Sequence, residues 1–346
     1  KPVAVIGIIG GTRYMDIDNS ATARPRQGLE VMKRAVAYFQ TRKVTAVVHL
    51  GDVIAAENAS CGTQYTALQP FEAERQRLSS CGWHLAAGQA DCINFGSTRA
   101  AHAALKTARD EASERTYYTI FPANRWRLMV LDAFDMGSVA NPGNAGVPSP
   151  GMSDTQLLWI GAQLSVADAA GEKVILICHL PLQDLFNGQA VRERIASYPG
   201  LVVIVLTLTM SGFGTYTTDA GGTHHLAPNA VSGLEVNEDA FGILEVFDDK
   251  LRLEMKGTNP DGSPNGWPIE LALPRGGRLV TAEAAAPLMA GFIWFWLFLA
   301  RTVFAPLSPV VRMLTSQDSS GAADGTTQSG ATKEDAEDAE DASGLV

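Results

Sequence analysis

Two short apolar runs flank an amphipathic segment at the start of the chain. Residues 3–9 (VAVIGII) and 45–50 (TAVVHL) are rich in β-branched residues, and each run ends at a glycine. The segment 28–43 between them carries apolar residues at spacings of three or four, the stripe of a helix packed on a sheet: Leu29, Met32, Val36 and Phe39. A strand, a helix and a second buried strand in this order limit the chain to a fold built on a parallel or mixed sheet covered by helices.

Later segments extend this pattern. Three more apolar runs predict strands over 126–132, 173–179 and 201–209. A helix is predicted over 153–169, because Ser153 and Gln156 have the spacing of a capping box. Residues 240–256 alternate around two aspartates, which indicates a β-hairpin. Parallel units followed by antiparallel strands predict an α/β domain with a mixed sheet or two sheets.

The sequence changes character after residue 273. Residues 284–300 form a run of 17 uncharged residues, close to the lower limit of about 17 to 25 for a membrane-spanning helix. We therefore predict a domain at 1–273, a linker at 274–283, an apolar transmembrane or membrane-anchor segment at 284–312 and an acidic disordered tail at 313–346. Trp294 and Trp296 lie centrally in the apolar run, which leaves open an amphipathic or protein-buried anchor.

Charge is unevenly distributed along the chain. The net charge is −10, but residues 315–346 hold eight acidic residues and one lysine, so that residues 1–314 carry only −3. No lysine- or arginine-rich stripe is present to bind a phosphate backbone, and we expect no nucleic-acid partner. The four cysteines, none in a C-x-x-C pair, predict free buried thiols, although a bridge between the first two is open: Cys61, Cys81, Cys92 and Cys178.

Two polar residues follow predicted strands and are candidates for a site. Asp52 comes directly after the strand at 45–50, and His179 ends the strand at 173–179. Sheets of α/β proteins usually present ligands and metals at these strand ends, and the loop at 88–91 is a third segment that can face them. The competing interpretation is an ordinary buried aspartate and histidine.

The order of these segments resembles the calcineurin-like metallophosphoesterases, most closely the manganese-dependent ADP-ribose/CDP-alcohol diphosphatases. The resemblance spans about residues 3–261 and is carried by seven segments in the same order: 7–9, 27–29, 50–54, 88–95, 156–160, 179–181 and 241–247. It implies two packed mixed β-sheets flanked by helices, an α/β/β/α sandwich, to which the apolar segment adds a C-terminal membrane helix. It also implies a two-metal site at the strand ends.

The ligand positions implied by this resemblance are only partly filled. Asp52 and His179 match metal ligands of the family, and Gln89 stands where an asparagine ligand is expected. The other positions have lost the ligand or the catalytic histidine: Gly11, Arg13, Ala90, Thr207 and Thr209. Two metals that activate a water need carboxylate and imidazole ligands. We therefore expect no catalytic residues, an insufficient metal site and no cofactor, with manganese as the alternative.

Other residues of ligand type lie near these segments. Asp16, Asp18, His224 and His225 are suitable ligands by type, but we expect Asp16, Asp18 and His225 at turns or on the surface. Arg13 and Asp52 are expected to form an ion pair where the family holds a metal, because an unpaired carboxylate in a closed pocket is costly.

These expectations favour a catalytically inactive domain that serves as an accessory subunit of a larger membrane complex. Its partners would be the other subunits and, through residues 284–312, membrane lipid. The chain begins at Lys1 without an initiator methionine, which favours import into an organelle, the mitochondrial inner membrane ahead of a plastid membrane. The alternative is an active or nucleotide-sensing manganese-dependent diphosphatase of the ADP-ribose/CDP-alcohol type.

Overall fold

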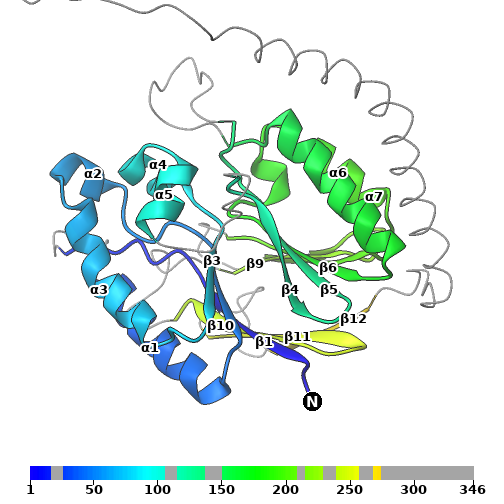
Figure 1. Ribbon diagram of the computed structural model, residues 1–346, viewed down its shortest axis with the longest axis horizontal. Helices are drawn as coiled ribbons and strands as arrows, with labels where there is room; N and C mark the ends of the chain where they lie inside the picture. Colours follow the sequence, from blue (N-terminus) through cyan, green and yellow to red (C-terminus); the bar gives the residue numbers. More distant parts are fainter. Residues whose placement is uncertain are drawn as a thin grey trace, which may run out of the picture. The chain divides into compact units, whose positions relative to one another are not determined.

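Two six-stranded mixed sheets pack face to face, and helices cover their outer faces (Figure 1). This computed structural model describes residues 1–16, 26–105, 115–136, 150–208, 215–228, 239–256 and 268–273. All of them fall in the unit Lys1–Ala285. The predicted linker, apolar segment and acidic tail at 274–346 lie outside the described residues and stay predictions. Within the described part, no helix has the length and apolar character needed to span a membrane.

The first sheet holds both predicted N-terminal strands and the predicted hairpin. Its order is β12-β11-β10-β1-β2-β3. The strands are β1 (Ala4–Ile9), β2 (Ala46–His49), β3 (Gly82–Leu85), β10 (Phe241–Val246), β11 (Lys250–Lys256) and β12 (Ile269–Ala272). β1 is parallel to β2 and antiparallel to β10, so the N-terminal strand lies at the centre of a mixed sheet.

The second sheet contains the other three predicted strands, and its order is β4-β5-β6-β7-β9-β8. Its strands are β4 (Tyr118–Ala123), β5 (Trp126–Val130), β6 (Lys173–Ile177), β7 (Val202–Leu206), β8 (Thr215–Thr218) and β9 (His224–Ala227). The core from β5 to β9 is parallel, and antiparallel strands close both edges. The carboxyl ends of β5, β6 and β7 therefore meet at one edge of the sheet.

Helices form the outer layers. α1 (Gln27–Arg42) and α3 (Gln64–Gln76) pack on the first sheet, next to the short helices α2 (Glu57–Cys61), α4 (Gln89–Phe95) and α5 (Thr98–Ala104). α6 (Asp154–Ala169) and α7 (Gly188–Ala196) cover the second sheet, and the 3₁₀ turn η1 (Leu182–Asp184) precedes α7. The resulting α/β/β/α order is the arrangement that the resemblance implies.

Strand alternation explains why both faces of each sheet are buried. On β2, Val48 joins the core between the sheets and Val47 joins the core under α1 and α3. On β6, Ile175 and Ile177 face the first sheet, whereas Leu176 faces α6 and α7. Because successive side chains of a strand point to opposite faces, a strand buried on both faces is apolar throughout. This is the pattern that the sequence shows in each of these strands.

The capping box predicted for α6 is half correct. The Ser153 hydroxyl accepts a hydrogen bond from the backbone N–H of Gln156 at 3.1 Å, as an N-cap does. The Gln156 side chain turns inward instead: its Oε1 accepts from the N–H of Asp132 at 2.9 Å, and its Nε2 donates to the carbonyl of Asp132 at 2.8 Å. The start of α6 is thereby fixed to the chain that leaves β5.

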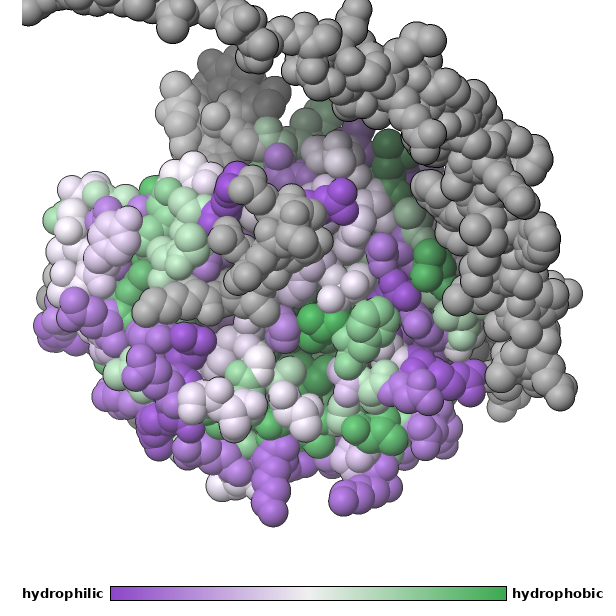
Figure 2. Space-filling view, viewed as in Figure 1, coloured by the Kyte–Doolittle hydropathy of each residue, from purple (hydrophilic) through white to green (hydrophobic). Residues whose placement is uncertain are grey.

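The described surface mixes polar and apolar residues (Figure 2). The exposed large apolar side chains belong to separate elements, among them Tyr65 on α3, Phe121 on β4 and Leu158 on α6. Scattered apolar residues of this kind are normal on a folded domain. The four cysteines are free, as predicted, although Cys61 is exposed and only Cys92 and Cys178 are fully buried.

Candidate functional site

Asp52 lies in a sharp turn that directly follows β2. Gly51 and Asp52 both have positive φ, +94° and +54°. A side chain at Gly51 would place its Cβ 2.4 Å from the Ala86 carbonyl oxygen and 2.4 Å from His179 Nδ1. Burial lowers the pKa of His49 to about 3, so that its neutral ring accepts the Gly51 N–H at Nδ1, 3.1 Å away. Glycine is therefore required at position 51, and the turn aims Asp52 at the strand ends.

Arg13 and Asp52 form the predicted ion pair. Arg13 Nε and Nη2 both donate to Asp52 Oδ2, at 2.9 and 2.6 Å. The Asp52 side chain is 1% exposed and that of Arg13 is 35% exposed, so the pair joins a buried carboxylate to the surface. Burial by itself raises the pKa of Asp52, but His179 and Arg13 outweigh burial and hold this pKa below its ordinary value. Asp52 is therefore a carboxylate at neutral pH.

His179 lies beside Asp52, as the meeting of the two strand ends predicts. Its Nε2 is 3.7 Å from Asp52 Oδ1, and its Nδ1 is 2.6 Å from the carbonyl oxygen of Leu50. A carbonyl only accepts hydrogen bonds, so Nδ1 carries the proton and Nε2 faces the carboxylate. The loop at 88–91 closes on both side chains: a Cβ at Gly88 would lie 2.3 Å from Asp52 Oδ1 and 2.5 Å from His179 Cε1.

Asp91 organises this site, a role that sequence reasoning missed. Its fully buried carboxylate accepts three backbone hydrogen bonds, from Asp52 and Gly88 at 2.8 Å and from Val53 at 2.9 Å. Burial, followed by the negative charge of Asp52, raises the pKa of Asp91 to about 6. Asp91 thus ties the turn after β2 to the start of α4. The available signal was its position three residues after Gly88, the spacing of a capping box.

The remaining predicted positions do not converge on Asp52 as ligands. Ala90 contributes only its backbone N–H, which donates to Asp52 Oδ1 at 2.8 Å, and Gln89 is half-buried at the start of α4. Gly11 is buried, and a Cβ there would meet Leu208 Cδ2 at 3.0 Å. Thr207 directly follows β7 and lines a separate pocket on the outer face of the second sheet. Thr209 lies outside the described residues.

The other residues of ligand type lie elsewhere. Asp16 is exposed and pairs with Arg26 at 2.8 Å, in keeping with the surface position expected for it. Asp18 lies outside the described residues. His224 hydrogen bonds to Tyr216 and Thr218 on the neighbouring strand β8. His225 lies on β9, is partly exposed and lines the same pocket as Thr207.

The residues around Asp52 do not fit a two-metal centre. Such a centre holds two ions about 3.5 to 4 Å apart and needs several carboxylate and imidazole ligands. Across the described ranges, no group of three or more His, Cys, Asp and Glu side chains is placed to hold a metal ion. Asp52 Oδ2 is taken by the Arg13 guanidinium, a cation that repels a metal. The Leu208 side chain adds an apolar wall beside Gly11.

The two packed sheets, with the loops that meet around Asp52 and His179, form a metallophosphoesterase fold. A crystal structure of a dimetal phosphatase from Danio rerio superposes with a TM-score of 0.68 at 20% sequence identity, covering 79% of this chain and 100% of that one. No family model matches the sequence.

Curated relatives confirm the resemblance to the manganese-dependent ADP-ribose/CDP-alcohol diphosphatases. The protein of that name from Danio rerio is 23% identical over 319 residues, which cover 75% of this chain and 97% of the relative. The human protein is 25% identical over 265 residues, 62% of this chain and 76% of the relative. Because these relatives depend on manganese, our expectation that no cofactor is involved is contradicted. The expectation of no cofactor rested on the missing ligand types alone and did not take into account the similarity along the whole domain.

Proposed function

We propose that this chain acts on nucleotide diphosphates of the ADP-ribose or CDP-alcohol type, and that its turnover depends on manganese, as the names of its relatives state for them. The observation that carries this proposal is the strand-end site itself. Asp52 and His179 lie 3.7 Å apart, and the Gly88 loop closes on them. These are the two family ligand positions that the sequence retains. The similarity over 97% of the Danio rerio relative supports the same substrate class.

The chain's own residues offer contacts for a diphosphate at this site. A guanidinium carries five N–H donors, and Asp52 engages Arg13 through Nε and Nη2. The other donors of Arg13 are available to phosphate oxygens, because the side chain is 35% exposed. The half-buried Gln89 supplies an amide beside the same loop. These residues bind and orient a diphosphate, and no bond-breaking step follows from the geometry around Asp52.

The test measures ADP-ribose hydrolysis with and without added MnCl₂, in the wild-type chain and in the Asp52→Ala variant. We expect manganese-dependent release of AMP by the wild type and a loss of at least 100-fold in Asp52→Ala. The matched control is Asp16→Ala, which removes an exposed carboxylate from an ion pair outside the site. Absence of turnover by a folded wild-type chain at saturating manganese would overturn the proposal.

A second candidate function is that of an accessory subunit without phosphoester turnover. The Arg13–Asp52 ion pair favours it, because a carboxylate that bridges metals in the family is here neutralised by the chain itself. The domain would then contribute its surface to a larger complex in an organelle membrane. Its partners would be the other subunits and, through residues 284–312, lipid. The mitochondrial inner membrane is favoured over a plastid membrane.

Native-gel migration after gentle solubilisation of membranes tests this second function. We expect stoichiometric co-migration with a large complex, identified by mass spectrometry of each gel slice. Migration near the mass of the chain alone would exclude a stable subunit role.

A further inference from the structure

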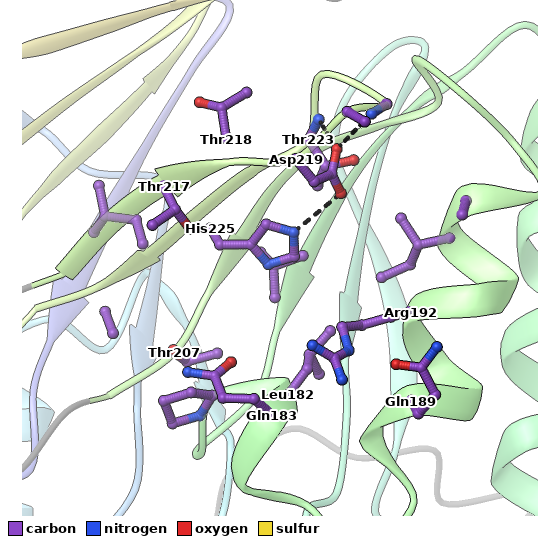
Figure 3. Close-up of a pocket in the computed structure, with 18 of the residues that line it drawn as sticks. Leu182, Gln183, Gln189, Arg192, Thr207, Thr217, Thr218, Asp219, Thr223 and His225 are labelled. Carbon is purple, nitrogen blue, oxygen red and sulfur yellow. Dashed lines mark hydrogen bonds and ion pairs between the residues drawn. The ribbon is translucent and has the colours of Figure 1, made fainter.

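A pocket of about 830 Å³ lies on the outer face of the second sheet (Figure 3), and neither Asp52 nor His179 lines it. Strand register builds its floor. Val205, His225 and Thr217 lie side by side across β7, β9 and β8, because Val205 pairs with His225 and His225 pairs with Thr217. Thr207 is two residues after Val205, and Thr215 is two residues before Thr217. Because side chains two residues apart on an extended chain point to the same face, both threonines share the face of the floor. The floor is therefore polar except at Val205.

Helix α7 builds the opposite wall. Gln189, Arg192, Glu193 and Ala196 line the pocket and have the i, i+3, i+4 and i+7 spacing of one helix face. Ala196 on α7 and Ala227 on β9 are both small and both line the pocket. Small side chains on the two walls keep the helix and this part of the sheet from filling the space between them. The volume falls within the range of about 300 to 1,000 Å³ typical of small-molecule sites.

The charged side chains that line this pocket differ in whether they have a partner within the protein. Asp219 accepts hydrogen bonds from the backbone N–H groups of Gly221 and Thr223 at 2.9 Å and lies 3.2 Å from His225 Nε2. Burial raises the pKa of Asp219, but the Thr223 N–H and the His225 ring outweigh burial and keep this pKa below its ordinary value. Glu193 accepts from Gln189 at 3.0 Å. Both carboxylates of the lining therefore already have hydrogen-bond donors.

Arg192 is the exception. Figure 3 shows its side chain reaching from α7 toward the side of the pocket that carries His225. Among the described residues, no carboxylate pairs with Arg192, in contrast to the engaged Arg13. The ring of His225 donates Nε2–H to the Asp219 carboxylate, so Nδ1 accepts from a P–OH group when the ring is neutral and donates to a phosphate oxygen when the ring is protonated. A cation without an internal anion, an oriented imidazole and threonine hydroxyls together form a set of groups that suits an anion with several oxygens.

We propose that this pocket binds a phosphate monoester of sugar or nucleotide size, with its phosphate on Arg192 and His225. A phosphate is favoured over a carboxylate because its three terminal oxygens match the guanidinium, imidazole and hydroxyl groups more fully than two oxygens do. The apolar lining formed by Leu182, Ile195 and Val205 suits the body of such a ligand. The proposal is independent of the function proposed above, because the pocket and the Asp52 site use different side chains.

Calorimetric titration of the full chain tests this site with AMP and ribose 5-phosphate, against adenosine and ribose as uncharged counterparts. We expect saturable binding of at least one monoester and binding at least tenfold weaker for its counterpart. Arg192→Gln should weaken monoester binding at least tenfold. Arg194→Gln, two residues along α7 and not part of the pocket lining, should leave it unchanged. Because Arg192 is exposed, its substitution should leave the fold intact, so weaker binding is not explained by unfolding. A thermal melt of each variant verifies that it is folded.

The outcomes separate the two sites. Equal binding of AMP and adenosine, equal affinities of the Arg192→Gln and Arg194→Gln variants, or no saturable binding of either monoester would each overturn the pocket proposal. Asp52→Ala should leave monoester binding intact. If Asp52→Ala abolishes this binding while Arg192→Gln does not, the ligand occupies the Asp52 site and the pocket proposal is wrong.

Discussion

The Asp52 site lies at the ends of β2 and β6, and the Arg192 pocket lies on the outer face of the second sheet; the arginine is ion-paired in the first region and has no ion pair among the described residues in the second. In the site, Arg13 donates twice to a carboxylate that is 1% exposed, and the closing loops leave no room for a side chain at Gly51 or Gly88. In the pocket, Arg192 faces about 830 Å³ of open space without an ion pair in the described residues. The Asp52 site is closed by its own residues, whereas the Arg192 pocket has polar groups available to a ligand. The following predictions test this contrast.

The largest effect is expected from Gly51→Ala. Its φ of +94° is strained for alanine, which costs about 1 to 2 kcal/mol, and the new Cβ would lie 2.4 Å from the Ala86 carbonyl oxygen. With about 2 kcal/mol for overpacking, we expect a loss of about 3 to 4 kcal/mol in the free energy of unfolding, measured by urea denaturation. Gly62→Ala is the matched control, because Gly62 also has positive φ, +67°, with nothing within 4 Å. Equal losses in both variants would contradict a tightly closed site.

A smaller effect is expected from Arg13→Met, which leaves Asp52 buried without its cation. Breaking a buried pair costs about 3 to 5 kcal/mol, and the 35% exposure of Arg13 places this variant near about 3 kcal/mol. Arg192→Met should change the free energy of unfolding by less than about 0.5 kcal/mol. The Arg13→Met, Asp52→Asn double variant should recover part of the loss. Equal urea midpoints for Arg13→Met and Arg192→Met would remove the contrast between the regions.

The smallest effect concerns pH. Arg13 and His179 keep the pKa of Asp52 low, against burial, which raises it. Loss of Arg13 removes one of the groups that oppose burial, so the folded-state pKa of Asp52 should be higher in the variant than in wild type, and the stability difference between the two proteins shrinks as pH falls through the variant's folded-state pKa. We therefore expect the deficit of Arg13→Met relative to wild type to be about 1 kcal/mol smaller at pH 5 than at pH 7.5. A deficit that grows on acidification would contradict this assignment.

Asp91 contributes a pH dependence of its own, and because the charge of Asp52 acts on the pKa of Asp91, this contribution also responds to the loss of Arg13. Its folded-state pKa of about 6 lies above the ordinary 3.8, so its contribution to stability falls as pH rises through about 6. The wild-type chain should therefore show a decrease in urea midpoint as pH rises through about 6.

The sequence predicts most of the core of the fold because strand and helix periodicity is strong there. The runs at 3–9 and 45–50 become β1 and β2, and the hairpin around Asp248 and Asp249 becomes β10 and β11. The Arg13–Asp52 pair was predictable from the cost of an unpaired buried carboxylate. The short strands β8 and β9 were missed, because four-residue strands with threonine and histidine lack a clear apolar alternation.

The pocket was not predictable from motifs. Thr207 was considered only as a position where a histidine ligand is missing, yet alternation along the chain turns it to the outer face and turns Leu208 toward Gly11. The pocket also depends on the spacing between α7 and the sheet, which small residues set from two distant segments. Such a spacing follows from tertiary packing and leaves no local pattern in the sequence.

The Gln156 amide, which holds both backbone groups of Asp132, has a consequence for hydrogen exchange. The Asp132 N–H donates to Gln156 Oε1 at 2.9 Å, so its protection from solvent depends on a side chain of α6 instead of a neighbouring strand. Exchange at this amide requires α6 to move away from the end of β5. The rate of exchange at Asp132 therefore reports the docking of a single helix, separately from the opening of either sheet.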